Sequence, residues 1–297
     1  MKLLFATDLH GRNNHLQQLV DLAGQHAPDL LIMGGDVLPD ADPADPLGSQ
    51  VRFLVNDMTG YLGQLRRTCP AARVATVLGN HDWLCTYQAM QDLQQQGWLH
   101  ILQLDNSLTV GGFAFLGYSY APPCPYVVKD FEKLDFPGQP YLFDGGLVWD
   151  SRQRRPRQVD GAHYLQGRSS IREDLRRAPR LDTPDWVLVA HAPPGNTHLD
   201  VLPHVGHVGS RSVDEFLRDR QPALSLHGHI HESAALTGHY WQHLGTTIAV
   251  NPGQREDTLA AVLVELTTDI VTLTPLAIEG AGTDPVVLSR SLTGRPV

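Results

Sequence analysis

Cysteine is scarce in this sequence: the 297 residues include three, at Cys69, Cys85 and Cys124. Their number is odd, their spacing is wide, and no two of them form a Cys-x-x-Cys pair. These features argue against both a disulfide framework and a zinc site built from thiolates. The scarcity favours a reducing compartment, and we therefore expect a cytoplasmic protein.

Long apolar runs are missing as well. No run approaches the roughly 18 to 20 apolar residues that are needed to span a bilayer. The first run, Leu3 to Ala6, begins two residues into the chain and leaves no room for the apolar segment of a secretory signal. We therefore expect a soluble protein with no membrane partner.

An excess of positive charge is the third feature that the chain lacks. It has 23 Lys and Arg against 32 Asp and Glu, for a formal net charge of -9. A surface that binds long nucleic acid usually requires a basic footprint, so we expect no such partner. A small phosphate ester remains compatible with this charge, because bound metal ions would supply the positive charge locally. The composition carries no signal for an oligomeric state.

Short apolar runs alternate with helical patterns in the first part of the chain. Leu3 to Ala6, Leu30 to Met33 and Val74 to Leu78 read as buried strands. Apolar residues recur at helical spacing from Leu16 to Ala23 and from Val51 to Leu65. Because crossovers of this kind are right-handed, the units predict parallel strands in a helix-covered sheet, which is an α/β fold.

The pattern changes toward antiparallel strands after a third helix, which we expect from about Trp83 to Gln96. Further strands are predicted at 108–110 and 113–116 as a hairpin, and at 186–190, 224–226, 246–250, 259–266 and 270–276. A helix is expected around 213–217. The stretch 118–184 has a weak pattern apart from a short helix at 171–177, and it reads as an insertion. We predict one domain over 1–278 and a C-terminal tail over 279–297.

Polar clusters stand at the carboxyl ends of five predicted strands. In chain order they are Asp8 with His10, then Asp36, then Asn80 to Asp82, then His191, and then His229 with His231. In open α/β sheets, ligands bind beyond the carboxyl ends of the strands, where these loops converge. Each cluster alone also suits a structural turn or a helix cap. Five together predict one shared site.

Four histidines, two aspartates and one asparagine would make up the ligand set of that site. Imidazole nitrogen suits Zn, Fe and Ni, and carboxylate and amide oxygen suits Mn, so the mixture favours a pair of transition-metal ions without naming them. Asp36 is the natural bridge between two ions, because its carboxylate has two oxygens and such ions lie roughly 3.5 to 4 Å apart.

The motifs that carry these residues have a familiar order. Asp8-x-His10, Gly35-Asp36, Gly79-Asn80-His81-Asp82, His191 and Gly228-His229-x-His231 resemble the signature of the calcineurin-like metallophosphoesterases. The resemblance covers about Lys2 to Gly253, outside the insertion, and is greatest to small bacterial and archaeal cytoplasmic members. It implies two mixed β-sheets packed as a sandwich and flanked by helices, with a dinuclear metal centre.

The resemblance also implies a role for each motif residue. Asp8, His10, Asp36 and His231 would hold one metal, and Asp36, Asn80, His191 and His229 the other. His81 would face the substrate rather than a metal. From the mechanism we further expect Asn80 to contact the phosphoryl group, and Asp82 to orient His81 rather than to bind a metal. His207 is a further candidate for the substrate pocket, although an ordinary loop histidine is the simpler interpretation of that residue.

These expectations combine into a hypothesis about function. We expect a metal-dependent phosphoester hydrolase, favouring a phosphodiesterase that acts on a small, cyclic-nucleotide-like substrate. A hydroxide that bridges the metals would attack phosphorus, and His81 would protonate the leaving alkoxide. Two alternatives stay open. One is a phosphomonoesterase of broad specificity, and the other is a non-catalytic binding module that uses the insertion for a partner.

Overall fold

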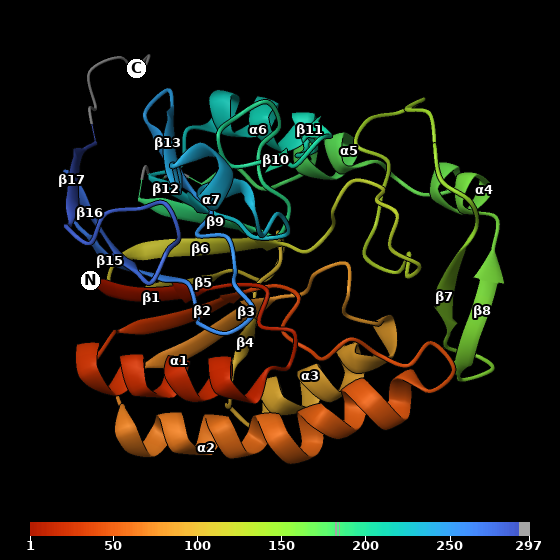
Figure 1. Cartoon of the computed structure of the whole chain (residues 1–297), viewed down its shortest axis with the longest axis horizontal. Coiled ribbons are helices and arrows are strands. Elements are labelled where there is room, and N and C mark those ends of the chain that lie inside the picture. Colours follow the sequence, from red (N-terminus) through yellow and green to blue (C-terminus); the bar gives the residue numbers. More distant parts are fainter. Residues whose placement is uncertain (182, 184, 291–297) are drawn as a thin grey trace.

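Two mixed β-sheets pack face to face and are covered by helices on both outer sides (Figure 1). The computed structural model describes residues 1–181, 183 and 185–290. The predicted fold class, a helix-flanked sandwich of two mixed sheets, is confirmed by this arrangement.

The first sheet contains the strands from the beginning and the end of the chain. Its order is β17 (Val286–Ser289), β16 (Ile270–Leu276), β15 (Ala261–Leu266), β1 (Lys2–Ala6), β2 (Leu30–Gly34), β3 (Arg73–Val77) and β4 (His100–Ile101). The strands β1 to β4 are parallel, and β15 runs antiparallel to β1. The predicted parallel core is therefore present, with an antiparallel half beside it.

The second sheet is built from the middle of the chain. Its order is β13 (Trp241–Leu244), β14 (Thr247–Val250), β12 (Leu224–Leu226), β9 (Trp186–Ala190), β6 (Phe113–Tyr118) and β5 (Leu108–Val110). Its four central strands are parallel, whereas the β5–β6 hairpin and β13 are antiparallel. The strands predicted at these positions are present, and β13 was not predicted.

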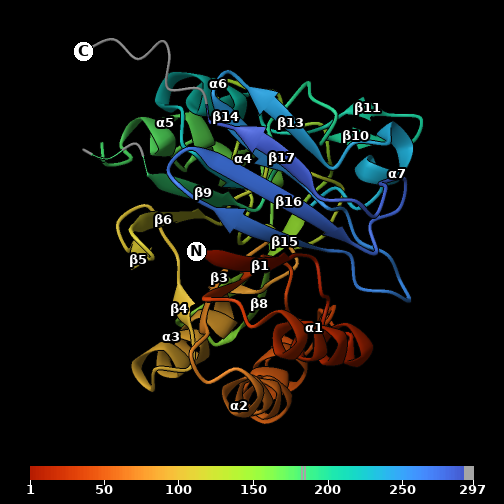
Figure 2. The same ribbon diagram turned by 90° about the vertical axis from the view of Figure 1, so that its left-hand side faces the viewer.

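Helices cover the outer face of each sheet. Beside the first sheet lie α1 (Asn13–His26), α2 (Thr59–Thr68) and α3 (Tyr87–Gln95), which gather on one side in Figures 1 and 2. Two π-helical turns at 47–51 and 54–58 lead into α2, and a 3-10 turn at 84–86 leads into α3. Beside the second sheet lie α5 (Ile171–Arg176) and α6 (Arg211–Arg220).

The alternation of side chains along the strands explains why the strand sequences are apolar throughout. Leu3 and Phe5 of β1 point into the core between the two sheets, whereas Leu4 and Ala6 point toward the helices. A strand with both faces covered reads as a continuous apolar run rather than an alternating one. The same division holds in β9, where Val187 and Val189 face the inter-sheet core.

The predicted insertion at 118–184 lies between β6 and β9. Beyond the predicted helix, it contains a hairpin of β7 (Gly146–Asp150) and β8 (Arg155–Val159), and a short helix α4 (Gly161–Gln166). The hairpin and α4 lie to one side of the sandwich (Figure 1). Much of β8 is exposed, so it lacks the apolar pattern by which a buried strand is recognised.

The predicted C-terminal tail differs from the structure in its middle part. Within 279–297, Val286–Ser289 forms β17, which pairs antiparallel with β16 at the edge of the first sheet. Residues 291–297 of the predicted tail lie outside the described residues. A pattern of alternating burial over four residues is too short to predict an edge strand from the sequence.

Within the part of the chain that the structure describes, no helix has the length and apolar character needed to cross a membrane.

Three short elements complete the fold around the second sheet. The strands β10 (Val201–Leu202) and β11 (Gly206–His207) form a small ribbon, and α7 (Ser233–Thr237) follows the Gly228–His231 motif. Ser233 of α7 accepts a hydrogen bond from the Val201 amide at 2.9 Å. This contact ties the ribbon to the loop that carries His229 and His231.

Candidate active site

The site lies where the carboxyl ends of β1, β2 and β3 meet those of β9 and β12. Asp8, Asp36 and Asn80 follow strands of the first sheet, and His191 and His229 follow strands of the second. The loops are joined by backbone hydrogen bonds: the Asp8 amide donates to Gly35 at 3.0 Å, and the His10 amide donates to Asp36 at 2.9 Å. The site therefore sits across the seam between the two sheets.

The backbone at this seam is strained. Asp8, His10, Asp36 and His229 all have positive φ, between 47° and 68°. A residue other than glycine in this region costs on the order of 1–3 kcal/mol, and such residues cluster at functional sites. The conformation turns the chain sharply at the end of each strand and directs the side chains of these residues toward one another.

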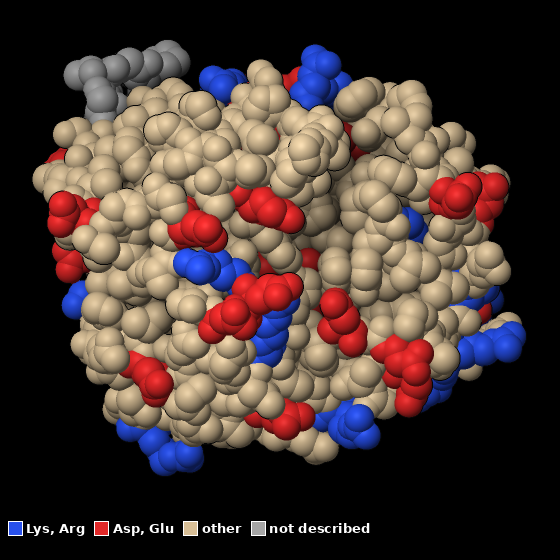
Figure 3. All heavy atoms as spheres, in the orientation of Figure 1, with Lys and Arg blue, Asp and Glu red and all other residues tan. Residues whose placement is uncertain are grey.

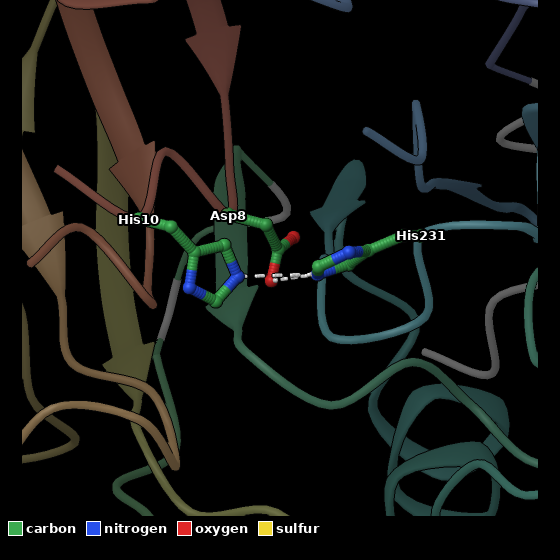
Figure 4. Close-up of side chains that lie close together, drawn as sticks. All are labelled: Asp8, His10 and His231. Carbon is green, nitrogen blue, oxygen red and sulfur yellow. Dashed lines mark hydrogen bonds and ion pairs between the residues drawn. The ribbon is translucent and has the colours of Figure 1, made fainter. Parts of the chain in front are cut away.

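Asp8, His10 and His231 form one cluster of potential ligands (Figure 4). The buried Asp8 carboxylate lies 3.3 Å from Nε2 of His231, which in turn lies 3.4 Å from Nε2 of His10. Burial raises the pKa of Asp8, but the charge of His231 outweighs this effect and holds the pKa at about 2. The cluster therefore offers one ionised carboxylate and two ring nitrogens within 4.8 Å of one another.

Asp36, His191 and His229 form the second cluster, and Asn80 lies beside it. Nε2 of His191 lies 3.3 Å from Asp36 Oδ2 and 3.1 Å from Asn80 Oδ1. Nδ1 of His191 lies 2.9 Å from the Gly34 carbonyl, which leaves Nε2 to face the cluster. Burial, followed by repulsion from His191, lowers the pKa of His229 to about 3, so this ring is neutral and has a lone pair to donate.

The two clusters fit metal ions by the chemistry of their donors. Asp8 and Asp36 are 0% and 1% exposed, and none of the described ion pairs joins either carboxylate to a Lys or Arg. Buried carboxylates are normally paired or coordinate metals. Two histidine nitrogens that face each other at 3.4 Å in one cluster also suit a shared cation. The structure thus brings together all seven side chains that the sequence nominated as metal ligands.

His81 lies beside both clusters, but no hydrogen bond within the described part of the chain links its ring to the carboxylate of Asp8 or Asp36. Its backbone amide donates to Asp36 Oδ1 at 2.8 Å, and its ring stacks on Tyr126 at 3.6 Å between centroids. Nδ1 lies 2.7 Å from the carboxylate of Asp40, so Nε2 is the ring nitrogen that does not face this carboxylate. Burial lowers the pKa of His81, but Asp36 and Asp40 outweigh it and raise the pKa above its usual value.

Asp40 is a site residue that the sequence did not reveal. The same carboxylate oxygen that meets His81 lies 3.5 Å from Nδ1 of His10, so Asp40 contacts both a predicted ligand and the predicted acid. Asp40 stands in a loop rich in Pro and Asp, where Asp42 and Asp45 are equally plausible by sequence. The sequence feature that could have identified Asp40 is its position four residues after Asp36.

Asp82 occupies a different place from the one predicted. Its buried carboxylate accepts hydrogen bonds from the Leu38 amide at 3.1 Å and the Gly79 amide at 2.9 Å. Burial, and next the charge of Asp36, raise the pKa of Asp82 to about 7. Asp82 thus ties the loop after β2 to the loop after β3, and the contact expected between Asp82 and the His81 ring is made by Asp40 instead.

His207, predicted for the substrate pocket, lies in β11. Its Nδ1 is 2.8 Å from Asp200, and 47% of its side chain is exposed. No hydrogen bond or ring contact found among the described residues joins it to the two clusters. The structure therefore groups His207 with the β10–β11 ribbon rather than with the other nominated residues.

Asn251 supports the loop that carries His229 and His231. Its buried amide donates to the carbonyls of Gly228 at 3.2 Å, Ile230 at 3.1 Å and Leu199 at 3.0 Å.

A cavity next to His231 has a volume of about 480 Å³. Its lining includes Arg12, Arg255 and Glu232. On the face shown in Figure 3 the surface is hollowed near its middle, with acidic side chains below the hollow.

Comparison with solved structures found matches along nearly the whole chain, and the two with a TM-score above 0.5 agree with the fold. One solved structure matches with a TM-score of 0.57 at 15% identity, over 98% of this chain and 99% of that chain. The protein TT1561 of Thermus thermophilus matches with a TM-score of 0.51 at 15% identity, over 97% and 98%. A novel archaeal phosphodiesterase matches with a TM-score of 0.38 at 9% identity, over 97% and 99%. No curated protein sequence matches the chain.

A family model matches residues 1–233, a range that includes both clusters of potential ligands and His81. The matched range extends from the strand before Asp8 to the residues just after His231, and it covers more than half of the sequence. The chain belongs to the calcineurin-like phosphoesterase family.

Proposed function

We propose that this protein is a phosphodiesterase that depends on a dinuclear metal centre and hydrolyses a small, cyclic-nucleotide-like ester. The observation that carries the proposal is the pair of clusters beside the ring of His81, each with one buried carboxylate and two histidines. A phosphoesterase that had become a binding module would have no need to keep both sets of ligands complete.

The residues divide between two metal positions. Asp8, His10 and His231 would hold one ion, and Asn80, His191 and His229 the other, with Asp36 between them. Ions bound there would polarise the phosphoryl oxygens and make water nucleophilic near neutral pH. Manganese, iron, zinc and nickel all suit this mixture of nitrogen and oxygen donors.

His81 is the proposed general acid. Asp40 engages Nδ1 of the ring, so Nε2 is the nitrogen that can donate a proton to the leaving alkoxide. The Tyr126 ring packs on one face of the imidazole and restricts its rotation. The Asn80 amide and a protonated His81 would both stabilise the negative charge that develops on the phosphoryl group.

The proposed compartment and partners are supported by the free cysteines and by the charge of the chain. Cys69, Cys85 and Cys124 are free in the structure, which fits a reducing cytoplasm. Acidic and basic side chains are interspersed over the face in Figure 3, and a net charge of -9 supports a small ester rather than long nucleic acid.

The test is a substrate panel with added Mn, Fe, Ni or Zn. We expect metal-dependent turnover of bis(p-nitrophenyl) phosphate that exceeds turnover of p-nitrophenyl phosphate, and loss of activity in Asp36→Asn. His81→Ala should lower kcat by about 10² to 10⁴-fold while metal content is retained. Preference for the monoester would support a phosphomonoesterase. A purified protein that binds no metal and turns over neither substrate would support the binding module.

A further inference from the structure

Asn80 has a neighbour from the insertion on the side away from His191. The two ends of its amide face different groups: Oδ1 lies 3.1 Å from Nε2 of His191, and Nδ2 donates to Sγ of Cys124 at 3.6 Å. An amide side chain can turn by 180° and exchange these ends, and before a metal ion binds its hydrogen-bond partners decide which end faces the cluster.

The Cys124 thiol donates its hydrogen in one defined direction. Its S–H donates to Oε1 of Glu132 at 3.2 Å, so the sulfur presents lone pairs toward Asn80. A sulfur that presents lone pairs accepts a hydrogen bond from the NH₂ end of an amide and repels the oxygen end. The direction of the hydrogen bond from Cys124 to Glu132 therefore selects the rotamer of Asn80 in which Oδ1 points into the cluster.

A buried ion pair holds this arrangement in place. Lys129 Nζ lies 3.0 Å from Glu132, and the two side chains are 1% and 0% exposed. The same ammonium donates to the Cys124 carbonyl at 2.8 Å and also to the Tyr126 carbonyl. A buried ion pair contributes little to stability on its own because of its desolvation cost. Here it fixes the backbone on both sides of Pro125 and so places Cys124 against Asn80.

We propose that Cys124 is a positioning residue of the metal centre, which acts with Glu132 and Lys129 to orient the Asn80 amide as an oxygen ligand. The insertion thereby becomes part of the site rather than an appendage to the fold. The inference rests on the metal centre of the proposed function, but it requires neither a particular substrate nor turnover.

Calorimetric titration of the metal-free full chain with Mn²⁺ tests the inference without any substrate. Partners that orient a ligand typically change metal affinity by 10 to 100-fold, so Cys124→Ala should weaken binding of one Mn²⁺ by about that factor. Cys124→Ser should restore affinity to within about threefold, since a hydroxyl also donates to Glu132 and accepts from Asn80. Glu132→Gln should weaken binding as well. The glutamine amide can donate a hydrogen bond to the sulfur of Cys124, and the thiol hydrogen would then no longer be held toward residue 132.

Cys69→Ala is the matched control, because Cys69 donates to the Pro28 carbonyl far from the site. It should bind Mn²⁺ as the unaltered protein does. Melting curves of each metal-free variant would show that loss of affinity is not loss of folding. The inference is overturned if Cys124→Ala binds both ions with unchanged affinity, or if Cys124→Ser is as impaired as Cys124→Ala. Failure of the unaltered protein to bind Mn²⁺ would instead refute the metal centre itself.

Discussion

At the scale of single residues, one carboxylate of the candidate site contacts two histidines. Asp40 lies 2.7 Å from Nδ1 of His81 and 3.5 Å from Nδ1 of His10. A carboxylate on the far nitrogen of an imidazole fixes its tautomer and orientation, so that the near nitrogen faces the metal or the substrate. Asp40 therefore links the proposed acid to one of the proposed ligands, although 66% of its own side chain is exposed.

Asp40→Asn should lower kcat by about 10 to 100-fold, because both rings lose their charged partner. It should also shift the pH profile. Asp36 and Asp40 raise the pKa of His81 against the lowering effect of burial, and an acid must be protonated to act. Removing one of these charges lowers that pKa, so the alkaline limb of kcat should move to lower pH.

Asp42→Asn is the control for this variant, since Asp42 is exposed in the same loop and accepts a hydrogen bond from the Ala44 amide. Its kcat and pH profile should match those of the unaltered protein. An Asp40→Asn variant with both metals bound and an unchanged alkaline limb would argue against the role assigned to Asp40.

At the scale of elements, the turns after the strands can pack closely because two of them have glycine at a position where no side chain fits. A Cβ at Gly79 would lie 2.2 Å from Asp36 Oδ1 and 2.6 Å from His191 Nε2. A Cβ at Gly228 would lie 2.0 Å from Thr7 Oγ1 and 2.4 Å from Asp8 Oδ2. These glycines let the loops of β3 and β12 approach the loops of β1 and β2.

Gly79→Ala should displace Asp36 and His191 and weaken Mn²⁺ binding by more than about tenfold, measured by titration. Gly60→Ala is a matched substitution in α2, where a Cβ meets nothing within 4 Å. It should leave metal binding unchanged and raise the free energy of unfolding by about 0.4 to 1 kcal/mol, because alanine is the better helix former. Equal Mn²⁺ affinity in the two variants would contradict the packing argument.

The edge strand β17 contributes to the core through one face. Leu288 is 9% exposed and packs with the cluster between the sheets, whereas its neighbour Val287 is 65% exposed. Leu288→Ala should lower the free energy of unfolding by about 2 to 3 kcal/mol. Val287→Ala should change it by less than about 0.5 kcal/mol. Denaturant melts of the two variants would test the assigned register, and similar costs would count against it.

At the scale of the whole molecule, the candidate metal site spans the two sheets. Asp8, Asp36 and Asn80 belong to loops of the first sheet, and His191 and His229 to loops of the second. Ions held by both sets would therefore join the halves of the sandwich in addition to serving the reaction. Anything that binds the folded chain alone stabilises it by mass action.

Manganese should consequently raise the melting temperature, and EDTA should reverse the change. At a free Mn²⁺ concentration 100 times Kd, one site contributes about 2.7 kcal/mol. Asp36→Asn should lose most of this increment, whereas Asp42→Asn should keep it. Differential scanning calorimetry at several Mn²⁺ concentrations is the measurement, and a melting temperature that is independent of metal would speak against a site shared between the sheets.

The sequence by itself determined the buried strands and the residue types at their ends. Apolar runs such as Leu3 to Ala6 are local patterns, and the donor atoms that Asp8, His191 or His229 can offer are fixed by residue type, so both could be read directly. The parallel arrangement then followed from general rules of chain connection. The fold class and the set of candidate ligands were accordingly within reach of the sequence.

Only the tertiary structure decided which segments meet. Asp40 rather than Asp82 contacts the His81 ring, and Cys124 reaches Asn80 across 44 residues of sequence. Pairing of β17 with β16 is likewise a matter of packing at a sheet edge. Such contacts carry no local periodicity, because they depend on how separate loops and the insertion pack against a completed sandwich.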